Sequence, residues 1–149
     1  MLSVSTFRYE FSVDASLEAV AAVHRNTGAL KKLSPPPMIV QLHRIDPMAE
    51  GSISEFTLWL GPIPIRWRAV HSQVSVNGFT DSQENGPMAF WAHTHHFETI
   101  NDTQTRIHER IEYTHPVGLR GFFTRLLFGK LGLLFLFSYR AWATKRALE

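Results

Sequence analysis

Apolar and polar residues alternate with a period of two over most of the chain. Residues 4–13 (VSTFRYEFSV) place Phe7, Tyr9 and Phe11 on one face and predict a first strand. The same period returns after the three prolines that end at residue 37. It predicts six further strands, at residues 38–45, 52–60, 64–76, 79–83, 88–99 and 105–114. Between two of them, Asn77-Gly78 predicts a type I′ hairpin, because both residue types tolerate a positive φ angle.

Two short helices are predicted between the first strand and the second. Leu17, Val20 and His24 recur at helical spacing, and Asp14 precedes them as a candidate N-cap. A second helix is predicted over residues 27–33, because the prolines that follow cannot continue a helix.

The segment after Pro116 is rich in Leu and Phe and predicts one long helix. Its longest uncharged run, residues 131–139, is much shorter than the roughly 20 residues that span a bilayer, so we expect no integral membrane association. Its basic residues are expected to line a solvated outer face, with contact to anionic lipid as the alternative. Gly129 and Gly132 are expected to make room for packing.

This order of elements predicts an α+β fold. A strongly curved sheet of seven antiparallel strands can cover the apolar stripe of a long helix on its concave side, which leaves a potential cavity between the two. The length of 149 residues suits one domain, residues 1–149.

Composition excludes several classes of function. The chain has no cysteine, which excludes disulfides and thiolate metal ligands. A net charge of +2 is too small to indicate a nucleic-acid-binding surface. No apolar leader with a basic flank precedes the first strand, so we expect a cytoplasmic protein. We expect no metal and no cofactor, and the sequence does not indicate an oligomeric state.

Residues 90–99 (FWAHTHHFET) carry three of the eight histidines. If Thr99 pairs with Thr105 in the last hairpin, His95 lies opposite Glu109. One face then carries Trp91, His93, His95 and Phe97 from one strand and Ile107, Glu109, Ile111 and Tyr113 from the other. A shift by one residue would put charged side chains on the aromatic face. We therefore expect His93, His95 and Glu109 to point inward and His96 outward.

Four interpretations of this cluster follow from its chemistry. The pair of His95 and Glu109 can simply satisfy buried polar groups. His93, His95 and Glu109 can instead orient the polar end of a bound molecule. In an enzyme, His95 with Glu109 would move protons while Tyr113 polarises a carbonyl. Metal binding by His93, His95 and Glu109 ranks lowest, because the motif offers no further dedicated ligand.

The chain resembles the bacterial START-like helix-grip superfamily (SRPBCC), which includes polyketide cyclases/dehydrases and lipid-transfer domains. The resemblance is carried by Phe79-x-Asp81-x-Gln83-x-x-Gly86-Pro87 and by Trp91-x-His93-x-His95-x-Phe97. It implies a seven-stranded sheet that grips the C-terminal helix around a cavity for an apolar or amphipathic ligand. Superfamily members include binders, carriers and enzymes.

From these observations we expect binding of a small apolar or amphipathic molecule: a lipid, a polyketide or an aromatic compound. The residues expected to contact it are Trp67, Trp91, His93, His95, Phe97, Glu109, Ile111 and Tyr113. The alternative is a cyclase/dehydrase-type enzyme that acts in the same cavity. Asp81, which follows a turn, is expected to stabilise a loop.

Overall fold

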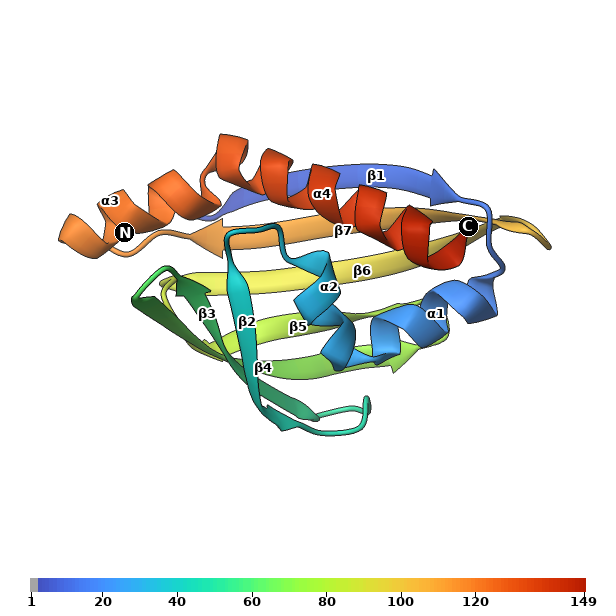
Figure 1. Ribbon diagram of the computed structural model, residues 1–149, viewed down its shortest axis with the longest axis horizontal. Helices are drawn as coiled ribbons and strands as arrows, with labels where there is room; N and C mark the ends of the chain where they lie inside the picture. The colour runs from blue at the N-terminus through green and yellow to red at the C-terminus, as the bar shows by residue number, and fades with distance from the viewer. Residues whose placement is uncertain (1–2) are drawn as a thin grey trace.

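Seven strands form one antiparallel sheet in the order β1-β7-β6-β5-β4-β3-β2, with helices over one of its faces (Figure 1). The computed structural model describes residues 3–149. Its strands are β1 (Ser5–Val13), β2 (Ile39–Ile45), β3 (Ile53–Leu60), β4 (Ile63–Ser75), β5 (Gly78–Asn85), β6 (Phe90–Asn101) and β7 (Gln104–Thr114). Its helices are α1 (Leu17–Arg25), the 3-10 helix η1 (Thr27–Ala29), α2 (Leu30–Leu33), α3 (Gly118–Phe128) and α4 (Lys130–Leu148). The predicted fold class is confirmed.

Helix α1 begins two residues later than its predicted cap implies. Ser16, and not Asp14, is the N-cap, because its Oγ accepts a hydrogen bond from the Ala19 N–H at 3.2 Å. Asp14 instead accepts a hydrogen bond from the Gln104 side chain at 3.1 Å, which ties the end of β1 to the β6–β7 turn. The predicted cap was therefore wrong, although the predicted helix forms.

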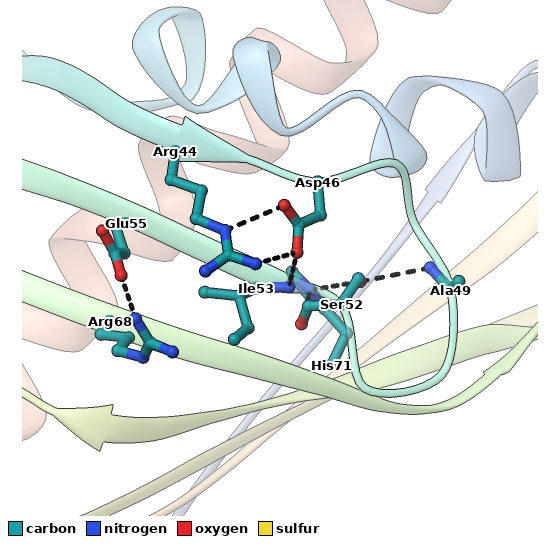
Figure 2. A network of polar contacts seen from close by, with 8 residues as sticks. All are labelled: Arg44, Asp46, Ala49, Ser52, Ile53, Glu55, Arg68 and His71. Carbon is teal, nitrogen blue, oxygen red and sulfur yellow. Dashed lines mark hydrogen bonds and ion pairs between the residues drawn. The ribbon is translucent and has the colours of Figure 1, made fainter.

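Polar contacts fix the turn between β2 and β3 (Figure 2). Asp46 accepts hydrogen bonds from the Arg44 side chain and, at 3.0 Å, from the Ile53 N–H. Next to this turn, the Oγ of Ser52 lies 3.1 Å from Nδ1 of His71 on β4. These contacts hold the His71 ring on the inner side of the sheet.

The hairpin between β4 and β5 forms one residue earlier than predicted, since Ser75 pairs with Gly78 and the turn residues are Val76 and Asn77, and the turn is not of type I′. Gly78 has a φ angle of 136°, whereas Asn77 is not among the described residues with a positive φ angle. Gln73 takes that conformation instead, with a φ angle of 53°, where the register shifts between Ser72 and Ser75. A non-glycine residue with a positive φ angle thus lies at a bulge in β4 and not in the turn.

The C-terminal segment forms two helices, which corrects the prediction of one. The chain is extended at Gly129, with a ψ angle of 175°, and this residue ends α3 and begins α4. Figure 1 shows α4 across β1 and β7, while α3 lies at the end of the sheet away from α1. Helix α4 packs on the sheet through Leu133, Phe137 and Ala141, all buried.

The break brings α4 close to the end of α3. A Cβ atom at Gly132 would lie 2.2 Å from the carbonyl oxygen of Leu127. A contact that short with backbone requires the helices to move apart. The absence of a side chain at Gly132 therefore sets how closely α4 follows α3.

Two apolar clusters form the core. One lies under the C-terminal helices and the other under α1. The larger lies beneath α3 and α4 and contains Trp67, Trp91 and Phe137. The smaller lies beneath α1 and is built around Phe97 and Ile107. The polar cluster described below lies where these two apolar clusters meet.

We predict that Gly132→Ala lowers the free energy of unfolding, although alanine is the better helix former by about 1 kcal/mol. The clash with the Leu127 carbonyl oxygen outweighs the gain in helix propensity. Chemical denaturation measures the change, and Ser138→Ala, at an exposed position of the same helix, is the control with little or no loss. An unchanged or higher stability of Gly132→Ala would contradict the close approach.

Candidate functional site

Strands β6 and β7 pair in the register that we derived from the sequence. Thr99 lies opposite Thr105, and His95 lies opposite Glu109. His93 and Glu109 are buried and His95 is 10 % exposed at its side chain, whereas His96 is exposed on the outer face. The inward direction of both histidines and of the carboxylate is therefore established.

A second carboxylate reaches this cluster from β5. Asp81 lies between His71 on β4 and His93 on β6 in the row that crosses the sheet. Phe79, which precedes Asp81 by two residues on β5, is buried. Because side chains alternate along a strand, Asp81 also points to the inner face. Our assignment of Asp81 to loop stabilisation was wrong.

The histidines and carboxylates contact one another directly. Nε2 of His93 lies 2.6 Å from Oε2 of Glu109, and Nε2 of His95 lies 3.1 Å from Oδ2 of Asp81. Nδ1 of His95 is 3.0 Å from the same Glu109 oxygen, but the geometry there gives no hydrogen bond, so this buried atom has no aligned partner. Each carboxylate thus contacts both imidazoles, since Asp81 also lies 3.8 Å from Nδ1 of His93.

Two helices add one side chain each. His24 on α1 donates from Nδ1 to the backbone oxygen of Val20 at 2.8 Å, and its ring lies 5.8 Å from that of His95. Arg140 on α4 lies over the Phe137 ring, with 5.2 Å between the guanidinium carbon and the ring centre. Its Nε is buried and has no hydrogen-bond partner among the described residues.

The two carboxylates determine which imidazole carries a proton. Burial lowers the pKa of His95, but the close contacts with the charged Glu109 and Asp81 together outweigh burial and raise this pKa to about 9. In return, although burial acts in the opposite direction, the histidines hold the pKa of Glu109 well below its usual value and lower that of Asp81. His95 is therefore an imidazolium between two carboxylates at neutral pH.

The other two imidazoles of the cluster are neutral. Burial, and then the positive charge of His95, lower the pKa of His93. The same two causes lower the pKa of His24 to about 4. With Arg140 charged, two cationic and two anionic side chains balance inside the fold. This balance offsets much of the cost of burying charge.

A cavity of about 140 Å³ lies beside the cluster. Its apolar wall includes Trp67, Trp91 and Phe128, and its floor is completed by Leu58 and Ala69. Polar groups gather at one side of it: His24, His71, Asp81, His93, His95 and Arg140. The lining comes from the sheet, from α1 and α2, and from both C-terminal helices.

The eight predicted contact residues divide into two sets. Trp67, Trp91, His93 and His95 line the cavity, whereas Phe97, Glu109, Ile111 and Tyr113 are not among its lining residues. Glu109 lies directly behind the two histidines, and Phe97 and Ile111 are buried in the core.

Tyr113 lies apart from the cluster. It is four residues along β7 from Glu109, which corresponds to about 13 Å, and its ring packs against Trp91 and His115. The structure therefore does not bring Tyr113 together with His95 and Glu109.

Sequence reasoning missed three residues of the cluster, and each had a signal. His24 shares the helical spacing of Leu17 and Val20 on the buried side of α1. Asp81 alternates with Phe79. Arg140 follows the buried Phe137 by three residues, which places it on the inner side of α4, although we had assigned the basic residues of this helix to the outer face.

Two sets of side chains in the cluster have the composition of a metal site. His24, His95 and Glu109 form one set, and Asp81, His93 and His95 form the other, each with ligand atoms within 4.8 Å of one another. Zinc requires neutral imidazoles at about 2.0–2.1 Å. His95 is protonated and its nitrogens face carboxylates, so an ion would have to displace these pairs. The absence of a metal remains a prediction.

A second and more open hollow, of about 560 Å³, lies on the sheet near β2, β3 and β4. Among its charged side chains, Arg68 contacts Glu55 and, at 2.9 Å, Glu84 (Figure 2 shows the first pair), and Arg66 is exposed to solvent. This hollow offers no buried unpaired donor, in contrast to the cavity at His95.

Comparison with solved structures identifies proteins of the same architecture. A START superfamily protein from Mycobacterium smegmatis superposes with a TM-score of 0.72 at 10% identity, over 96% of this chain and 96% of that one. The Zhui aromatase/cyclase from Streptomyces sp. R1128 gives 0.69 at 13% identity, over 97% and 91%. Norcoclaurine synthase from Thalictrum flavum, in complex with dopamine and hydroxybenzaldehyde, gives 0.71 at 17% identity, over 98% and 87%.

Similarity to known proteins is confined to the fold. No family model and no curated protein sequence matches the chain. The structural neighbours nevertheless cover it almost completely and share the sheet that curves around a C-terminal helix. The chain therefore has the helix-grip fold of the START-like superfamily.

Proposed function

We propose that the protein binds a small aromatic molecule that carries an oxygen acceptor, in the cavity beside His95. The observation that carries this proposal is a largely apolar cavity whose lining includes Ser54 and Arg140, two polar side chains that each have a buried atom without a hydrogen-bond partner among the described residues. The neighbours with this fold include a synthase in complex with dopamine and hydroxybenzaldehyde, which are small aromatic compounds.

The volume of the cavity limits the size of the ligand. An engineered cavity of about 150 Å³ with a Leu, Ile and Phe lining binds benzene. The cavity here, at about 140 Å³, suits one aromatic ring with a short substituent. A lipid chain or a polyketide of several rings exceeds this volume. Among the ligand classes expected from the sequence, the single-ring aromatic is favoured.

The unpaired donors determine the polar group of the ligand. Nε of Arg140 and Oγ of Ser54 are buried without hydrogen-bond partners among the described residues, and both residues line the cavity. Nδ1 of His95 is not available to a ligand, because it faces Glu109 at 3.0 Å behind the cavity wall. Leaving a buried donor unpaired costs about 1–3 kcal/mol, which a ligand oxygen would recover. Because the charges of the cluster already balance, a neutral acceptor such as a carbonyl adds no uncompensated charge. An anionic ligand would leave an excess negative charge in the interior.

We predict that acetophenone binds more tightly than ethylbenzene, which has the same ring and two-carbon chain but lacks the acceptor oxygen. 2-Acetylanthracene, with the same carbonyl on three rings, should not bind. Isothermal titration of the purified protein measures all three. Equal affinity for acetophenone and ethylbenzene, or binding of the three-ring compound, would contradict the proposal.

Matched variants locate the site in the same experiment. Arg140→Met should weaken acetophenone binding about tenfold, the effect of losing one hydrogen bond from a charged donor, and leave ethylbenzene binding nearly unchanged. Trp91→Ala should weaken binding of both compounds. Arg146→Met and Trp142→Ala alter exposed side chains of the same helix and serve as controls.

The charge of His95 predicts how stability depends on pH. Its pKa is higher in the folded protein, at about 9, than the 6.5 of an isolated histidine. This stabilisation is complete below pH 6.5 and is lost as the pH rises through 9, and it amounts to about 3 kcal/mol at most. Urea denaturation at pH 7 and above pH 9 should show the loss. The difference between wild type and His95→Gln should shrink over the same range, and a constant difference would contradict a protonated His95.

A cyclase/dehydrase-type enzyme is the second candidate, and the short contact between His93 and Glu109 favours it. His93 is neutral and held by a carboxylate, so in this version His93 is the base and the His95 imidazolium is the acid. Arg140 takes the polarising role that we had assigned to Tyr113. Such a site would abstract a proton next to a carbonyl group.

Exchange of the acetophenone methyl protons in D₂O, followed by NMR, tests this chemistry. The enzyme hypothesis predicts exchange that wild type accelerates and that both His93→Ala and the double variant His95→Ala/Glu109→Gln abolish. Tyr113→Phe should exchange as wild type does. If wild type binds acetophenone but exchanges no faster than the double variant, the protein is a binder without this activity.

A further inference from the structure

The outer face of the two C-terminal helices is apolar, contrary to the solvated basic face that we expected. On α3 the exposed side chains include Leu119, Phe122, Phe123 and Leu126. On α4 they include Leu131, Leu134, Phe135 and Trp142. We call these eight residues the apolar stripe. Leu126 is 68% exposed and Leu131 is 81% exposed, so no other described part of the chain covers the stripe.

The spacing of these residues makes the stripe continuous along each helix. Phe122 and Leu126 are one turn apart on α3, and Leu131, Phe135 and Trp142 follow at four and seven residues on α4, on one side of the helix. The opposite side of α4 carries the buried residues. Helix α4 is therefore apolar on two sides, of which the sheet covers only one. A helix that is apolar all round normally has a second apolar environment.

The charges around the stripe have one sign. Residues 113–148 contain six basic residues, at positions 120, 125, 130, 140, 145 and 146, and no acidic residue. All except Arg140 are exposed. Arg146 lies 5.2 Å from the centre of the Trp142 ring, so a cation flanks the end of the stripe. Exposed aromatic and aliphatic side chains flanked by cations are typical of helices that lie in the interface of an anionic membrane.

We propose that the apolar stripe binds the surface of an anionic phospholipid bilayer, with α3 and α4 lying in the plane of the interface. The stripe would enter the boundary between headgroups and acyl chains, and the exposed Arg and Lys side chains would contact lipid phosphates. This proposal does not depend on the ligand of the cavity, because none of the eight residues lines it.

The geometry favours surface binding over two other occupants. Residues Gly118–Leu148 are long and apolar enough to cross a membrane, but the chain breaks at Gly129 and one side of α4 is packed on the sheet. A second copy of the chain, stacked on the stripe by a two-fold axis, would bring two sets of cations together. Anionic lipid instead neutralises them.

Vesicle co-sedimentation tests the proposal directly. The protein should bind phosphatidylcholine vesicles that contain phosphatidylglycerol, and bind vesicles of phosphatidylcholine alone at least tenfold more weakly. Raising the salt concentration to about 0.5 M should reduce the binding, because the Debye length falls to a few ångströms. On binding, Trp142 fluorescence should shift to shorter wavelength, and Trp142→Phe should remove most of this shift.

Variants separate the stripe from the remainder of the surface. Phe122→Glu/Leu126→Glu should weaken vesicle binding more than tenfold and leave acetophenone binding and the circular dichroism spectrum unchanged. Ile63→Glu, at an exposed apolar position of the sheet, is the control with unchanged vesicle binding. The proposal fails if wild type does not bind anionic vesicles at low salt or if the double variant binds as well as wild type. It also fails if wild type does not bind vesicles and is a dimer by sedimentation equilibrium, while the double variant is a monomer. The stripe would then be a dimer interface.

Discussion

The pairing of His95 with Glu109 across β6 and β7 is the constraint on which the rest of the site depends. The register that joins them turns two imidazoles and one carboxylate into the interior. A buried carboxylate without a partner would be very costly. The positive charge of the His95 imidazolium offsets this cost, and Asp81 stabilises that imidazolium from the other side. Four charged side chains thereby balance in an apolar surrounding.

The charges near the cavity balance, but some of the buried polar atoms there have no hydrogen-bond partner among the described residues. Both nitrogens of His95 face carboxylates, whereas Arg140 brings a buried Nε and Ser54 a buried Oγ without hydrogen-bond partners among the described residues to the lining of the cavity. The cavity lies beside these donors and its remaining wall is aromatic. The same residues that satisfy one another's charge thus define a polar end for a ligand, and the two indole rings define its apolar end.

The sequence predicted the structure best where the alternation of apolar and polar residues showed which side chains are buried. It predicted less where this alternation is absent. Strand alternation identified which faces of β6 and β7 point inward, because a shift by one residue would put charged side chains on the aromatic face. The pairing of Thr99 with Thr105 that we assumed then gave the observed register. The sequence pattern did not identify Arg140. The spacing of three residues puts Arg140 on the same side of α4 as Phe137, but apolar residues occur on every side of this helix, so the sequence did not show which side packs on the sheet. The break at Gly129 also escaped prediction, since apolar residues continue on both sides of it. The break depends on a close approach of backbones that the pattern of side chains does not record.

The protonation state of His95 is the most direct test of this account, and NMR titration of the histidine ring signals measures it. The account predicts that His95 stays protonated at neutral pH and titrates at about 9, and that Glu109→Gln lowers this pKa. A His95 ring that is neutral at pH 7, with a pKa at or below the ordinary value of an isolated histidine, would contradict the buried charge balance on which the proposed site depends.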